Sequence, residues 1–130
     1  EAMLRAKAEE VLRFIGIEHL KDYPVAGQPY GILKKVELAR TLMYDPRLII
    51  LDEPAAGLND TETLSLMETI RAIRDKYNCS ILLIEHDMRF VNEICSRICA
   101  ISFGKLLAIG TPTEIQNNKE VQVAYLGKEE

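Results

Sequence analysis

The sequence lacks several features that would place it in a familiar class. It has no tryptophan, no apolar run of membrane-spanning length and no basic block interleaved with aromatic residues, so we expect neither a membrane span nor a nucleic-acid module. Its 3 cysteines form no C-x-x-C pair, and we expect buried thiols in a cytoplasmic protein without a signal peptide. An apolar fraction of 48% and a net charge of −4 are typical of a globular domain. The pair Lys34 and Lys35 is expected on the solvated face of a helix.

A further absence concerns phosphate binding. The loop G-x-x-x-x-G-K-[ST] does not occur, because the Gly-Lys pairs at 104–105 and 127–128 are followed by Leu and Glu. In proteins that have this loop, its backbone amides and its lysine supply most of the nucleotide affinity. The chain by itself is therefore predicted to have little activity on nucleotides.

The most informative segment is an apolar run that ends in adjacent carboxylates. Residues 48–60 read LIILDEPAAGLND, so that Asp52 and Glu53 follow an uninterrupted apolar run and precede a turn of proline and small residues. The run predicts a strand buried on both faces of a parallel sheet. Both carboxylates would then emerge at the carboxyl end of the strand, which is the edge where open parallel sheets bind ligands.

A second segment repeats this design. Residues 80–87 read SILLIEHD and again pass from an apolar run to polar residues, His86 among them. If the strands are neighbours, Asp52 could hold a divalent metal, Glu53 could polarise a water, and His86 could contact a phosphate or that water. Oxygen ligands suit Mg²⁺ better than zinc. For either strand alone, an acid that caps the next helix is the simpler interpretation, and the pair of strands favours the site.

These segments resemble motifs of the ATP-binding-cassette (ABC) family, in the order in which the family has them. LIILDE, residues 48–53, looks like the Walker B strand, AGLN, residues 56–59, like the D-loop, and His86 like the switch histidine. The strings DEPAAGLN and IEHDM are most similar to the ATPases of branched-chain amino-acid importers. The related lipopolysaccharide-export ATPases share much of them.

The family has a signature loop upstream of Walker B, and residues 28–42, QPYGILKKVELARTL, occupy that place. The usual LSGGQ maps onto QPYGI, in which Pro29 offers neither a hydroxyl nor an amide hydrogen and Ile32 replaces a glutamine. The resemblance leaves Gly31 and the amino terminus of the following helix as phosphate-facing features. Tyr30 could stack on an adenine or support the loop. An ordinary turn before an amphipathic helix is the alternative for this segment.

The resemblance also implies a mechanism and partners. Two cassettes of the family enclose two ATP molecules, and each site combines residues of both protomers. Asp52 would orient Mg²⁺, Glu53 would act as general base, His86 would sense the γ-phosphate, and Asn59 would help the D-loop to cross the interface. The implied partners are a second ATPase protomer, as a homodimer or heterodimer, and the membrane subunits of a transporter. The protein would then be peripheral on the inner face of the cell membrane.

The expected fold is the carboxyl-terminal half of an α/β, P-loop NTPase-like ABC ATPase, with parallel core strands flanked by helices and followed by a strand hairpin and a helix. Residues 1–27 would end a helical subdomain, residues 28–110 would carry the signature helix, Walker B and the switch histidine, and residues 111–130 would form a helix and tail. The first helix lacks a cap and an initiator methionine, so we expect a fragment whose missing amino-terminal half holds the P-loop. Such a fragment should expose an apolar sheet face.

Local patterns place the remaining elements. Asn59 and Glu62 form a capping-box pattern before a helix at about 61–77. A short helix is expected at about 88–95, then a hairpin of strands 97–102 and 105–109 that turns at Phe103 and Gly104. The sequence Gly-Thr-Pro-Thr-Glu at 110–114 opens a last helix.

Two other classes of function remain open. A non-catalytic interaction domain could keep the cassette fold without turning over ATP, and this fits the missing P-loop and the altered signature. A receiver-like α/β domain could use Asp52 for phosphate chemistry, although the acidic cluster that it needs after its first strand is missing from the amino-terminal segment. ATP hydrolysis that disappears in Glu53→Gln would count against the first class, and phosphodonor labelling of Asp52 would support the second.

Overall fold

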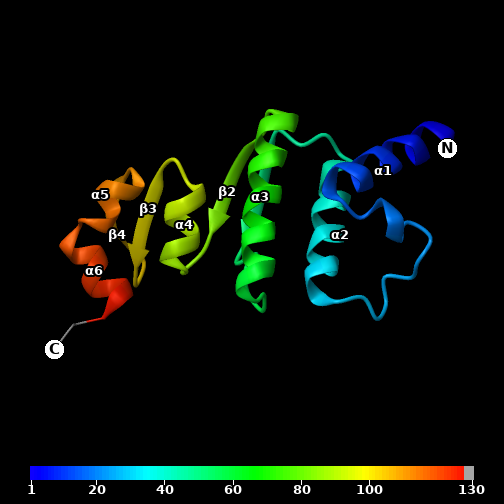
Figure 1. The fold of residues 1–130 in the computed structure, drawn as a ribbon. Coiled ribbons are helices and arrows are strands. Elements are labelled where there is room, and N and C mark those ends of the chain that lie inside the picture. The colour runs from blue at the N-terminus through cyan, green and yellow to red at the C-terminus, as the bar shows by residue number, and fades with distance from the viewer. Residues whose placement is uncertain (128–130) are drawn as a thin grey trace. The chain divides into compact units, whose positions relative to one another are not determined.

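The computed structural model describes residues 1–127 and divides into two compact units, the first ending at Leu82 and the second beginning at Leu83 (Figure 1). The first unit contains α1 (Ala2–Ile15), a 3-10 helix η1 (Glu18–Leu20), α2 (Tyr30–Leu42), β1 (Leu48–Asp52) and α3 (Asp60–Tyr77). The second contains α4 (Met88–Ile94), β3 (Ile98–Ser102), β4 (Lys105–Gly110), α5 (Pro112–Gln116) and α6 (Lys119–Leu126). The strand β2 (Ser80–Ile84) spans the division. None of the helices in the described part is long and apolar enough to span a bilayer.

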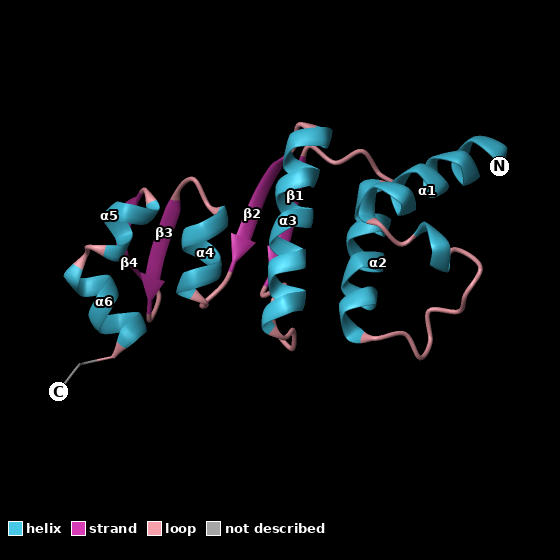
Figure 2. Ribbon diagram, in the orientation of Figure 1, coloured by secondary structure: helices cyan, strands magenta, loops and turns pink. Residues whose placement is uncertain are grey.

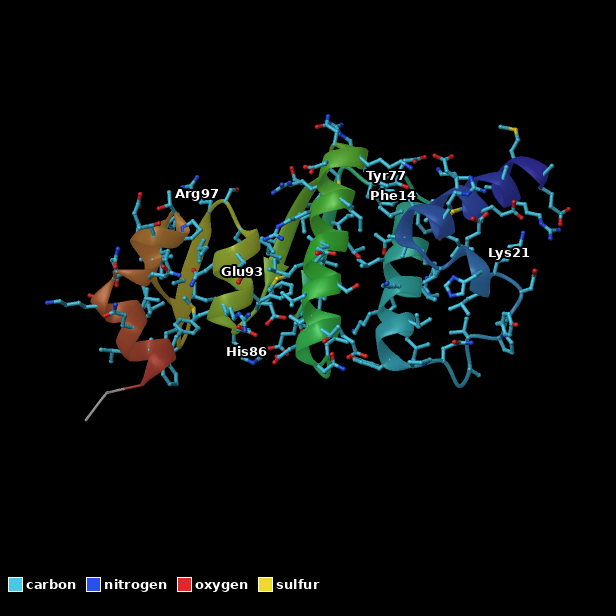
Figure 3. The ribbon with its side chains drawn as sticks, in the orientation of Figure 1. Phe14, Lys21, Tyr77, His86, Glu93 and Arg97 are labelled. Atoms are coloured by element: carbon cyan, nitrogen blue, oxygen red, sulfur yellow. The ribbon has the colours of Figure 1, made fainter. Side chains whose placement is uncertain are left out.

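In the first unit, α1 lies against α2 (Figure 1). The helix α1 ends because Gly16 adopts a left-handed conformation with φ of 84°, and the amide of Ile17 then bonds to the carbonyl of Leu12 at 2.9 Å. At the end of α1, the ring of Phe14 meets the ring of Tyr77 edge to face with centroids 5.5 Å apart (Figure 3). The apolar side chains buried in these helices are Val11, Ile15, Leu38, Ala39 and Leu42.

The strands β1 and β2 are hydrogen-bonded neighbours, and α3 connects them (Figure 2). The amide of Ser80, at the start of β2, donates to the carbonyl of Arg47, just before β1, at 3.0 Å. Because the two strands start side by side, they run parallel, as predicted.

The prediction that β1 is buried on both faces is wrong. Burial alternates along the strand: Ile49 is 3% exposed, whereas Leu48 and Ile50 are 54% and 60% exposed. An uninterrupted apolar run predicts burial on both faces only if a second layer covers the strand, and the described residues bury one face. The expected exposure of apolar sheet surface is confirmed for this strand.

In the second unit, β3 and β4 form the predicted antiparallel hairpin, with Ile98 opposite Gly110 and an irregularity after Ala100. Phe103 and Gly104 form its turn, with φ of 47° and 74° at these two residues. The hairpin packs on α5 and α6, and α4 packs on α5. These elements enclose a buried cluster of Val91, Ile98, Ala100, Ile115 and Val121.

The carboxyl-terminal segment differs from the expected single helix. Thr111 caps α5 and Pro112 is its first residue, as the sequence predicts. The helix then stops at Asn117, and the side chain of Asn118 caps a second helix, α6, by accepting from the amide of Val121 at 3.1 Å. Cys99, which we expected to be buried, is exposed.

Candidate functional site

The carboxylates predicted from the sequence stand where β1 ends. Asp52 is the last residue of β1, and Glu53 follows in a left-handed conformation with φ of 47°. A non-glycine residue in this region costs on the order of 1–3 kcal/mol, and such strain is concentrated at functional sites. Glu53 begins a tight turn, in which the amide of Ala56 donates to the carbonyl of Glu53 at 3.1 Å. The amide of Leu58 donates to the carbonyl of Ala55, also at 3.1 Å.

Asp52 lines a groove of about 200 Å³ between the end of β1 and the side of α2. Lys34 and Glu37 line the α2 side of this groove. The described residues contain no group of three or more His, Cys, Asp or Glu side chains that could hold a metal ion. A single carboxylate still fits Mg²⁺, because this ion is usually bound by one or two carboxylates together with substrate phosphates and waters.

The helix α2 begins at Tyr30, directly after Pro29. Pro29 provides no side-chain cap, and its carbonyl accepts from the amides of Ile32 and Leu33 at 2.9 and 3.1 Å. The amides of Tyr30 and Gly31 precede these bonded groups and lie at the positive end of the helix. This terminus is where the sequence predicts a phosphate-facing segment.

Tyr30 and Gly31 both approach the segment after β1. A Cβ atom built on Gly57 would lie 3.0 Å from Cε1 of Tyr30, and one built on Gly31 would lie 3.2 Å from Oε1 of Glu62. The ring of Tyr30 therefore packs on the D-loop-like turn. Of the two roles considered for Tyr30, this contact favours support of the loop.

Asn59 is the N-cap of α3. Its side-chain oxygen accepts from the backbone amide of Glu62 at 2.8 Å, and the backbone amide of Asn59 donates to Oε2 of Glu62 at 3.0 Å. The predicted capping box is confirmed. The side-chain oxygen and the backbone amide of Asn59 are thus both bonded to Glu62. The side-chain NH2 group is the part of Asn59 that could contact another molecule.

His86 belongs to the second unit and lies in the short connection between β2 and α4 (Figure 3). Its side chain is exposed, and its backbone amide donates to Oε2 of Glu85 at 3.2 Å. Asp87 follows as the N-cap of α4 and accepts from the amide of Phe90 at 3.2 Å. The first unit places Tyr30 and Gly31 at the start of α2, Asp52 and Glu53 at the end of β1 and Asn59 at the start of α3. The approach of His86 to these residues stays a prediction.

Lys34 is the functional candidate that sequence reasoning missed. Instead of lying on a solvated face, its side chain is 21% exposed, places Nζ 5.2 Å from the centre of the Tyr30 ring and bonds to Glu37 at 3.4 Å. Burial alone would lower the pKa of Lys34, but a hydrogen bond with Tyr30 and the charge of Glu37 raise it overall. The spacings of four residues from Tyr30 and three to Glu37 are the signal that could have indicated these contacts.

Two protein-family models match the chain. Residues 3–56 match the ABC transporter model, and residues 105–130 match the model of the branched-chain amino acid ATP-binding cassette transporter. The first match includes Tyr30, Gly31, Asp52 and Glu53. Asn59 and His86 lie between the two matched ranges.

Two curated proteins and one solved structure are similar to this chain over nearly its whole length. The high-affinity branched-chain amino acid transport ATP-binding protein LivG of Salmonella typhimurium is 42% identical over 133 residues, which cover 98% of this chain and 52% of LivG. The lipopolysaccharide export system ATP-binding protein LptB of Escherichia coli K12 is 35% identical over 123 residues, which cover 95% of this chain and 51% of LptB. The solved structure of the ADP conformation of MJ1267, an ATP-binding cassette of an ABC transporter, has a TM-score of 0.89 at 26% identity and is matched over 98% of this chain and 52% of that chain. The chain thus spans about half the length of the relatives it matches.

Proposed function

The chain belongs to the ATP-binding-cassette family, and from this we propose that it forms the carboxyl-terminal half of an ATP-hydrolysing subunit that drives branched-chain amino-acid import. One observation carries the proposal. Adjacent carboxylates end a parallel strand, and the second of them, Glu53, is held in a strained turn that leads into a capped helix. Such a turn fixes the direction of a carboxylate that must meet an attacking water.

We assign the chemistry to four residues. Mg²⁺, when bound with ATP, neutralises the charge that develops on the β- and γ-phosphate oxygens. Asp52 would hold this ion, and Glu53 would take the proton of the attacking water or orient that water. His86 contacts the γ-phosphate. Gly31 and the amino terminus of α2 face the ATP that is held by the partner protomer.

The proposed partners follow from the same scheme. An ATP site that needs a P-loop from one protomer and a signature segment from the other requires a second ATPase subunit, and this chain contains no P-loop motif. The amino-terminal half of a full-length cassette would supply the P-loop, and residues 1–27 would end the helical part that faces a membrane subunit. The assembly would lie on the cytoplasmic face of the membrane.

The cargo is inferred from similarity. LivG is 42% identical and LptB is 35% identical over similar lengths, and the family model matched at residues 105–130 is that of branched-chain amino-acid transporters. These matches favour amino-acid import over lipopolysaccharide export. The cargo itself is selected by membrane and binding subunits.

The first experiment is an intact mass of the native polypeptide, captured with an antibody to this segment, together with its ATPase rate. We expect a chain considerably longer than 130 residues, with an ATPase rate that Glu53→Gln lowers by about 100-fold. Glu68→Gln, on an exposed position of α3, is the matched control and should leave the rate unchanged. A native chain of this length that hydrolyses no ATP would instead support the non-catalytic interaction domain.

A further inference from the structure

The amino terminus of α2 touches the turn after β1 at a position that has no room for a side chain. Gly57 has a φ of 79°, and a Cβ there would lie 3.0 Å from Cε1 and 3.5 Å from Cδ1 of Tyr30. A separation of 3.0 Å is shorter than carbon atoms adopt in van der Waals contact. Glycine at position 57 therefore allows both the left-handed turn and the close packing of the aromatic ring.

A second close approach lies beside the first. Gly31, the next residue of α2, leaves space for the carboxylate of Glu62, because a Cβ on Gly31 would lie 3.2 Å from its Oε1. The other oxygen of Glu62 accepts from the amide of Asn59 in the capping box of α3. Two glycines, one on each segment, thus let the amino termini of α2 and α3 approach each other. The remaining space between the two helices is a groove of about 260 Å³.

The ring of Tyr30 is also held from its own helix. Lys34 lies one turn further along α2 with Nζ 5.2 Å from the ring centre, and Glu37 fixes the ammonium group at 3.4 Å. The turn at residues 53–58 is closed by backbone bonds from Ala56 to Glu53 and from Leu58 to Ala55.

We propose that Tyr30 is a positioning residue. Its ring packs on Gly57 and thereby fixes the turn that begins at Glu53 relative to the amino terminus of α2. The direction of the Glu53 carboxylate depends on this turn, because Glu53 is its first residue, has a left-handed φ of 47° and accepts the bond from the amide of Ala56 that closes the turn. Tyr30 thus acts on the water-activating carboxylate through the backbone. This inference rests on the proposed ATPase function.

The first arm of the test measures the contact without using activity. In the native polypeptide, Tyr30→Ala should speed hydrogen exchange at the amides of Ala56 and Leu58 by about tenfold, because the turn loses the ring that supports it. Tyr30→Phe keeps the ring and should leave both rates near wild type. Tyr44→Ala removes a tyrosine that is 84% exposed beyond α2 and is the matched control. Unchanged exchange in Tyr30→Ala would overturn the proposal.

The second arm separates positioning from nucleotide binding. Misplacement of a catalytic group by about 1 Å can cost roughly 100-fold in rate, so Tyr30→Ala should lower kcat by about 10- to 100-fold while KM for ATP changes little. Tyr30→Phe should restore most of kcat, and the exchange of α1 amides reports whether each variant is folded. If Tyr30→Ala is not folded, Gly57→Ala displaces the ring from the other side and should also lower kcat.

The outcomes distinguish this inference from the function on which it rests. A wild-type polypeptide without ATPase activity would overturn both. An active wild type in which Tyr30→Ala keeps its kcat, or raises KM alone, would overturn the positioning role and leave the ATPase assignment intact. Loss of kcat in Tyr30→Ala with recovery in Tyr30→Phe supports the proposal.

Discussion

At the scale of single residues, two left-handed glycines, Gly57 after β1 and Gly16 at the end of α1, differ in what an added side chain costs. Gly57→Ala would meet the Tyr30 ring as well as an unfavourable φ, whereas Gly16→Ala, at φ of 84°, would meet nothing within 4 Å. We expect Gly16→Ala to lower the free energy of unfolding by about 1 kcal/mol. Gly57→Ala should cost roughly 1–3 kcal/mol more, from overpacking. Urea unfolding measures both, and equal losses would contradict the close contact.

A pH-dependent ion pair gives a second residue-scale prediction. Glu18 accepts from Nε and Nη2 of Arg13 at 3.0 and 2.7 Å. These hydrogen bonds, together with the charge of Arg13, outweigh the opposing effect of desolvation and lower the pKa of Glu18. The lowered pKa means that the pair stabilises the fold above the unfolded-state pKa of Glu18, and this contribution is lost as the pH falls through its folded-state pKa.

Arg13→Ala should therefore raise the pKa of Glu18 toward its ordinary value, measured by NMR titration of its carboxyl group. Arg5→Ala is the matched control, because Arg5 pairs with Glu9 at 3.9 Å and should leave Glu18 unchanged. A Glu18 titration that is the same in wild type and Arg13→Ala would show that the pair has no effect in solution.

The sequence indicated some residues of the site and not their contacts. Asp52 and Glu53 could be found because an apolar run followed by adjacent acids is a local pattern, and the structure puts them at the end of β1. Two further features depend on tertiary packing, which spacing along the chain does not encode. They are the left-handed conformation of Glu53 and the packing of the Tyr30 ring on Gly57.

At the scale of elements, the capping box of α3 gives a measurable contribution. Asn59→Ala removes the oxygen that accepts from the amide of Glu62 at 2.8 Å, and we expect a loss of about 1 kcal/mol in urea unfolding. Asn59→Asp keeps an acceptor in the same place and adds a negative charge at the positive end of the helix, so it should match wild type. A loss in Asn59→Asp equal to that in Asn59→Ala would rule out the cap as the reason.

Elements with local signals were predicted better than elements that depend on their neighbours. The box at Asn59, the hairpin turn at Phe103 and the start of α5 at Thr111 each follow from a few adjacent residues, and the structure contains all three. The break between α5 and α6 at residues 117–118 was missed, although Asn118 is a good N-cap residue, because an asparagine within a polar stretch also fits a continuous exposed helix face.

At the scale of the whole molecule, the two-stranded sheet leaves apolar side chains in solvent. Leu48 on β1 and Leu82 on β2 are 54% and 53% exposed. In a full-length cassette, which is about twice as long as this chain, further elements could cover this surface, and we expect the 130-residue chain to associate through it instead. Exposed apolar strands are sites of association because water is released when two such surfaces meet.

The double variant Leu48→Lys with Leu82→Lys should shift the isolated chain toward monomer in sedimentation velocity, because each lysine adds a charge to the exposed strand surface. Met3→Lys with Tyr44→Lys makes the same change in charge at residues that are 86% and 84% exposed outside the sheet. It should leave the association as it is in wild type. If both variants dissociate equally, net charge rather than the sheet surface controls assembly. A wild type that is already monomeric at the concentrations where its fold is measured would show that the uncovered strands do not attract another copy.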